Sequence, residues 1–154
     1  MAFENEIAKL VAYEKNVTRE NINLLVDAGV DVGIFNLLDA IAAKNKSQAL
    51  KNLGDLLEKG ENEIFILTMI QKQIHNLALI FEKKKAGLSE SQIAQILKLH
   101  PFVVKKALGA LRQVGDTEVI KRYYGSVTEA EFFIKTGQKE PNVALELLVL
   151  NLSK

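Results

Sequence analysis

The chain has no cysteine and no tryptophan, and only two prolines and two histidines among its 154 residues. Without cysteine there can be no disulfide framework, thiol nucleophile or zinc–thiolate site, and the composition fits a reducing compartment. A chain of this length can bury roughly two-thirds of its unfolded surface, so it needs neither disulfides nor a metal to fold. Its length fits one domain, or one domain and part of another.

An excess of charge of one sign is also missing. Twenty Lys and Arg residues balance nineteen Asp and Glu residues, so the formal net charge is +1 and no global field favours nucleic acid or membranes. The N-terminus shows no basic stretch followed by an apolar run, so no signal peptide is visible. The most apolar stretch, 64–81, contains five polar residues between Gln71 and Asn76, which predicts a buried helix. We therefore expect a soluble, intracellular protein with no membrane partner.

Residues for catalysis are scarce. Only His75 and His100 could act as a base near neutral pH. The apolar surroundings of His75 indicate a hydrogen-bonded core histidine, and His100, directly before Pro101, is placed to cap a helix. The sequence contains no HExxH pair, no GxxxxGK[ST] loop and no GxGxxG motif. We therefore expect no enzymatic activity of its own, no cofactor and no metal site.

Apolar residues recur at helical spacing along the whole chain, and no strand-like alternation is present. The pattern predicts an all-α helical bundle of about nine helices, without the fixed period of a repeat protein. Gly29 and Gly33 flank the best boundary candidate, which divides the chain into residues 1–30 and 31–154. Gly125 and Ser126 are expected to bend or break the helix that Asp116 caps. The predicted helices span 6–14, 19–28, 34–43, 47–59, 61–85, two within 89–112, one from 117 and one from 141.

The two helices within Ser89–Arg112 form a candidate helix-turn-helix. Ser89 and Gln92 have the spacing of a capping box, and Pro101 suits the first turn of the second helix. A DNA-binding helix-turn-helix protein centred here is the alternative function, with Lys105 and Lys106 as candidate backbone contacts. Against it, a recognition helix reads bases with polar side chains of its first turn, and here that turn is mostly apolar.

Charge is uneven locally. Between Glu82 and Arg122 there are nine basic and four acidic residues, a local excess of five positive charges. A solvated helix face accounts for such a distribution. A salt-sensitive surface for nucleic-acid phosphates is the functional alternative.

The last predicted helix has too many apolar residues for one face, and Glu146 is its only charged residue between Asn142 and Leu152. It must lie deep in its own domain or be partly covered by another subunit. Phe132 and Phe133 point about 100° apart on a helix, so at least one is expected to lie outside the core. The candidate subunit interface comprises Phe132, Phe133, Leu145, Leu148, Val149 and Leu152.

Several segments, in order, resemble the C-terminal part of the delta subunit of bacterial DNA polymerase III, in the clamp-loader family. EIAKLVAY and VTRENINLLV are similar to the end of that family's lid domain, and the stretch from Ile34 to Leu77 to the start of its collar domain. GLSESQIAQILKLHPFVVKKAL and FFIKTGQKEPNVALELLVLNL resemble later collar segments. One departure is Glu131, where the family usually has aspartate.

The resemblance implies a clamp-loader collar-like bundle at 31–154, with a short helical remnant of the lid domain at 1–30. It implies a non-catalytic fragment of the polymerase III holoenzyme that assembles with the ATPase and delta-prime type subunits of the loader. The family's N-terminal domain, which would engage the sliding clamp, is expected to precede residue 1. The resemblance also places the loop 135–140 toward DNA, with Lys135 and Lys139 as backbone contacts made weakly or only within the assembly. It further implies a cytoplasmic, nucleoid-associated replisome protein.

Overall fold

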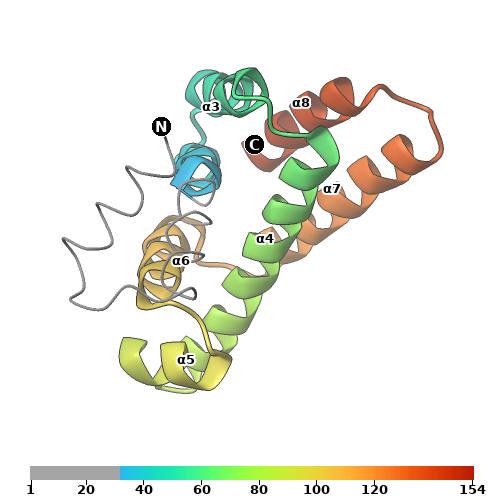
Figure 1. The fold of residues 1–154 in the computed structure, drawn as a ribbon. Helices are drawn as coiled ribbons and strands as arrows, with labels where there is room; N and C mark the ends of the chain where they lie inside the picture. The colour runs from blue at the N-terminus through green and yellow to red at the C-terminus, as the bar shows by residue number, and fades with distance from the viewer. Residues whose placement is uncertain (1–31) are drawn as a thin grey trace, which may run out of the picture.

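The structure, a computed structural model, describes residues 32–154, and all regular elements in this part of the chain are helices. The all-α prediction is therefore confirmed, and each of the seven helices expected within these residues is present. The helices expected at 6–14 and 19–28, and the domain assigned to 1–30, lie outside the described residues. Figure 1 shows the helices, which are Val32–Ala42, α3 (Lys46–Glu58), α4 (Glu63–Lys85), α5 (Glu90–Leu97), α6 (Pro101–Val114), α7 (Thr117–Lys135) and α8 (Pro141–Leu152).

The longest helix, α4, is the centre of the fold. The Asn62 side chain accepts hydrogen bonds from the backbone N–H groups of Ile64 and Phe65 and so caps its start. α4 packs against α5, α6, α7 and α8. By length and composition α4 could cross a membrane, but its apolar side faces these four helices, as in the core helix of a globular domain. Its apolar residues are not all enclosed, because Ile64 and Phe65 are 47% and 42% exposed.

Local signals at α5 and α6 act as the sequence predicts. Ser89 and Gln92 form a complete capping box at the start of α5. His100 caps α6, since its Nδ1 accepts a hydrogen bond of 3.0 Å from the Phe102 N–H, and Pro101 occupies the first turn. The inner face of α6, with Val104 and Leu111 buried, packs on α4. The helices α5 and α6 thus pack against each other and against α4 in one hydrophobic core.

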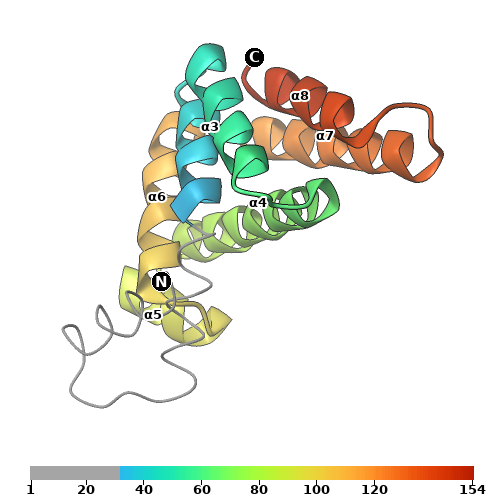
Figure 2. The same ribbon diagram turned by 45° about the horizontal axis from the view of Figure 1, so that its top comes forward.

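The first described helix, Val32–Ala42, lies beside α6 (Figure 2). The rings of Phe35 and Phe102 meet edge to face, with their centroids 5.5 Å apart. One turn further along both helices, Lys106 Nζ is 3.3 Å from Asp39 Oδ2. Phe35 therefore contacts Phe102 and Asp39 contacts Lys106, in the same order along both helices. The two helices thus run in the same direction.

The helix α7 is continuous from Thr117 to Lys135, so the expected break at Gly125 and Ser126 is wrong. Tyr123 lies before this pair and Val127 after it, and both are buried on the same side of the helix. Glycine in a helix interior costs only about 1 kcal/mol relative to alanine, less than packing on both sides can supply. α7 then turns at 136–140 and pairs with α8 in a hairpin whose loop extends away from α5 and α6 (Figure 1).

Candidate subunit interface

The apolar side chains of α8 divide into a buried set and an exposed set. Leu145 and Val149 are fully buried, and Leu148 and Leu152 are 2% and 1% exposed. All four pack into the chain's own core against α3, α4 and α7. Our prediction that these four contact a partner subunit is wrong, because a side chain enclosed by its own domain has no surface left for another.

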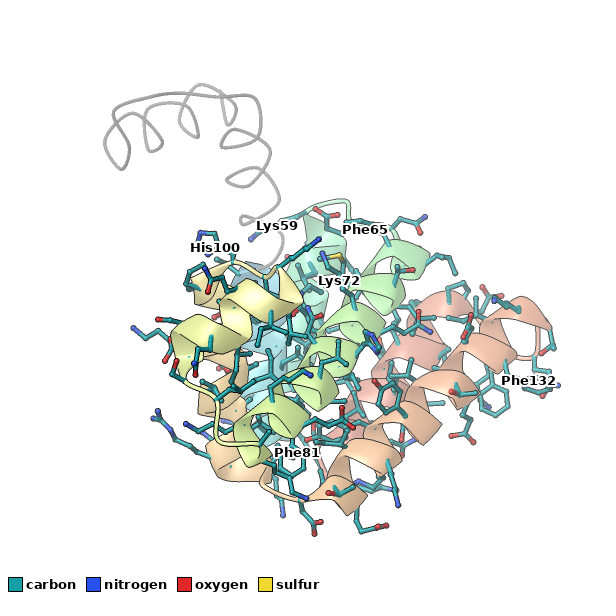
Figure 3. The ribbon with its side chains drawn as sticks, turned by 90° about the horizontal axis from the view of Figure 1, so that it is seen from below. Lys59, Phe65, Lys72, Phe81, His100 and Phe132 are labelled. Carbon is teal, nitrogen blue, oxygen red and sulfur yellow. The ribbon has the colours of Figure 1, made fainter. Side chains whose placement is uncertain are left out.

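Three large apolar side chains of the α7–α8 hairpin are exposed instead. Phe132, near the end of α7, is 52% exposed, and it lies at the outer edge of the hairpin in Figure 3. Val143 and Leu147 on α8 are 42% and 41% exposed. Because they are four residues apart, they lie on one side of α8. We call Phe132, Val143 and Leu147 the hairpin apolar set; it is the part of the hairpin that can offer apolar surface to a partner.

Of the adjacent phenylalanines, Phe132 lies outside the core as the helical geometry predicts, and Phe133 is half-buried. Phe133 packs within the hairpin, because Lys139 Nζ lies 4.6 Å from the centroid of its ring. The two rings are 6.0 Å apart, centre to centre. Sequence reasoning missed Val143 and Leu147, although their four-residue spacing was a usable signal.

Polar contacts fix the hairpin against the central helix. Gln71 Nε2 on α4 donates a 3.1 Å hydrogen bond to Glu131 Oε2, and Lys135 donates to the other carboxylate oxygen. The hydrogen bond and the charge of Lys135, with a smaller contribution from Gln71, hold the pKa of Glu131 below its usual value. Glu131 therefore links α4 to α7 in its ionised form.

A second polar pair joins the same two helices. His75 Nδ1 lies 3.2 Å from the Tyr124 hydroxyl oxygen. Partial burial and the nearby Glu82 carboxylate raise the pKa of the tyrosine. His75 is hydrogen-bonded as expected, but it is exposed on the surface between α4 and α7, so its assignment to the core is wrong. The apolar residues around it in the sequence face the other sides of α4.

The Glu131 contacts predict a pH dependence of stability. Folding lowers the pKa of this carboxyl, so the stability it contributes is present above its usual value of 4.5 and is lost as pH falls through the folded value. We expect the free energy of unfolding to fall less between pH 5 and about pH 3 in Glu131→Gln than in the wild type. Urea unfolding across this range measures it, with Glu129→Gln, an exposed site on the same helix, as control. Equal slopes for all three proteins would contradict the linkage.

The four candidate lysines differ in their surroundings. Lys135 pairs with Glu131, and Lys139 lies over Phe133. Lys106 pairs with Asp39 and is also 5.8 Å from the Phe102 ring centroid. Lys105 is exposed on the outer side of α6. The structure thus brings Lys135 and Lys139 together at the hairpin tip and separates them from Lys105 and Lys106, so the four do not form one surface.

Within residues 32–154 no group of three or more His, Cys, Asp or Glu side chains is placed to hold a metal ion. The two histidines lie on different contacts, one beside Tyr124 and the other at the start of α6. Among the described residues, the features that could bind a partner are therefore the exposed apolar side chains of the hairpin, with the ion pair of Lys135 and Glu131 beside them.

Comparisons with known proteins agree on one family. A model described as DNA polymerase III delta subunit, C-terminal domain, matches residues 31–152. The DNA polymerase III subunit delta of Bacillus subtilis (strain 168) is 30% identical over 155 residues, covering 97% of this chain and 44% of that protein. The solved Bacillus subtilis DNA clamp loader delta protein (YqeN) is similar in structure, with a TM-score of 0.77 at 28% identity and the same coverage of both chains. The chain therefore spans less than half the length of these relatives.

Proposed function

Because the chain belongs to the family formed by the C-terminal domain of the DNA polymerase III delta protein, we propose that it is a non-catalytic assembly module of a clamp loader. In this proposal it joins the loader's ATPase and delta-prime type subunits, which together place a sliding clamp on primed DNA. The module itself acts in the cytoplasm, at the replisome.

The hairpin apolar set is the observation that supports this role most directly. Three large apolar side chains 41–52% exposed on one protruding hairpin are typical of the apolar centre of a protein interface. Beneath them, the buried residues of α8 fix the hairpin on α3 and α4. A rigid element that offers apolar side chains can bind a partner with little ordering cost.

Removing this apolar surface tests the role of the hairpin. We expect the combined variant Phe132→Ser, Val143→Ser and Leu147→Ser to weaken binding to the loader's ATPase subunits by roughly 30-fold or more, since interface anchors contribute about 2 kcal/mol or more. Sedimentation or size-exclusion titration measures the change. The variant should keep its helical circular dichroism, because none of the three side chains belongs to the core.

Ile96→Ser is the matched control. Ile96 is 53% exposed, like Phe132, but it lies on α5, away from the hairpin. The control is expected to bind as the wild type does. Wild-type affinity of the hairpin variant, or equal losses in both proteins, would argue against the hairpin as the interface.

DNA contact is a finer part of the proposal. Lys135 and Lys139 at the hairpin tip are the candidates, and the Lys135 side chain remains 72% exposed while paired with Glu131. Two lysines can contribute only a modest, salt-sensitive backbone contact. We therefore expect DNA to be bound within the assembly, with little affinity for the separate chain.

A further inference from the structure

The outer face of α6 combines an apolar stripe with positive charge. Phe102 is 36% exposed, and Gly109 lies two turns further along the same side of the helix. Lys105 and Arg112 are exposed along one edge of this stripe. From Lys98 to Val114 the chain carries four basic residues and no acidic one. An added Cβ at Gly109 meets no atom within 4 Å, so another helix can approach α6 closely here.

The exposed face of α8 has a similar apolar stripe and the opposite charge. Val143 and Leu147, which are 42% and 41% exposed, form the stripe. Glu140, directly before the helix, and Glu146 are exposed, and at about 100° per residue they lie on the two sides of that stripe. From Glu140 to Ser153 the chain carries these two acidic residues and no basic one. The outer faces of α6 and α8 are therefore complementary in charge, and both offer apolar surface.

A single chain cannot bring these two faces together. The helix α6 lies on one side of α4, and the α7–α8 hairpin lies on the other side (Figures 1 and 2). The inner sides of both helices, with Val104 and Leu111 on α6 and Leu145 and Val149 on α8, are packed in the core. A contact between the two outer faces therefore needs two molecules.

We propose that the exposed face of α8 docks on the outer face of α6 of a second copy of this chain. Val143 and Leu147 then pack against Phe102 and over Gly109, and the two glutamates of α8 approach the basic residues of α6. Because the two faces are different surfaces, the contact is heterologous, and copies add one after another.

The contact is small, and it is therefore weak. A few apolar side chains and acid–base pairs cover less area than a stable dimer needs, so we expect a dissociation constant of about 10–100 µM. At about 1 µM the chain is then the 17.1 kDa monomer. The proposed role in a clamp loader is not a premise of this inference, because the second copy is its only partner. A second copy and an ATPase subunit compete for the same side chains of α8.

A charge swap tests the contact in the full chain. The α6 variant carries Lys105→Glu with Arg112→Glu, and the α8 variant carries Glu140→Lys with Glu146→Lys; all four side chains are exposed. Sedimentation velocity from about 1 µM to about 500 µM follows the association, since this range brackets the expected constant. Circular dichroism checks that each variant is folded.

The control variant carries Lys72→Glu with Lys84→Glu. Both lysines are exposed on α4, so the control changes the net charge as the α6 variant does but leaves both faces intact. The wild type and the control are expected to associate as the concentration rises. Each of the two swap variants alone places like charges at the contact and should associate more weakly by about tenfold or more.

An equimolar mixture of the α6 and α8 variants restores opposite charges between unlike chains, and it should associate as the wild type does. A wild type that stays at 17.1 kDa throughout, or a mixture that associates no better than its components, would overturn the proposal. An equal loss in the control would also overturn it. Binding of duplex DNA by the wild type and the control, but not by the α6 variant, would do the same, because nucleic acid would then occupy the face of α6.

Discussion

Leu145→Ala is expected to lower the free energy of unfolding by about 3–4 kcal/mol, whereas Leu147→Ala, two positions along the same helix, should lower it by less than about 1 kcal/mol. The Leu145 side chain is fully buried and the Leu147 side chain is 41% exposed. Truncating the first leaves a cavity between α8 and the helices that surround it, and truncating the second only removes surface. Urea unfolding of the two variants beside the wild type measures both values.

The two variants compare a core position with an exposed position of the proposed interface on the same helix. A similar loss of stability in both variants would mean that α8 is packed differently from the structure described. The division also decides how the interface can be tested, because a charge at Leu148 or Val149 would disrupt the fold itself. Substitutions at exposed positions such as Leu147 leave the fold intact and report on partners alone.

Gly125→Pro should cost about 3 kcal/mol or more of stability, because it removes one intrahelical hydrogen bond and clashes with the preceding turn in the middle of α7. Had the helix broken at Gly125, proline would be tolerated there. Gly125→Ala is the control, and it should stabilise the protein by up to about 1 kcal/mol, since an added Cβ meets no atom within 4 Å.

Thermal unfolding of both variants distinguishes a continuous helix from two shorter ones. A stable Gly125→Pro variant with wild-type helical circular dichroism would contradict the continuous α7. Because Gly125→Pro should lower the stability and Gly125→Ala should raise it, the two variants can be compared whatever the stability of the wild type.

The helix starts could be predicted because their signals are local. Ser89 with Gln92, His100 with Pro101, and Asp116 each supply a hydrogen-bond acceptor or a fixed backbone angle within one turn. Such signals act through neighbouring residues only. Their effect therefore does not depend on how the rest of the chain packs.

The positions of side chains around α4 and α8 could not be predicted in the same way. An apolar residue such as Leu147 differs from Leu148 only in the side of the helix that it occupies, and the packing of distant helices decides which side is inner. His75 shows the converse, because its apolar neighbours in the sequence lie on other sides of α4. The break expected at Gly125 is absent for a related reason. Buried residues before and after Gly125 stabilise a helix whose local helical preference is weak at this position.

A titration of the wild-type chain with purified clamp-loader ATPase subunits, in parallel with duplex DNA and followed by sedimentation velocity, tests whether the chain is an assembly module. If the chain is an assembly module, it should leave the 17.1 kDa species and join the larger complex, while duplex DNA at physiological salt leaves its sedimentation unchanged. A chain that stays at 17.1 kDa with the ATPase subunits, or that binds the duplex by itself, would overturn the proposed assembly role.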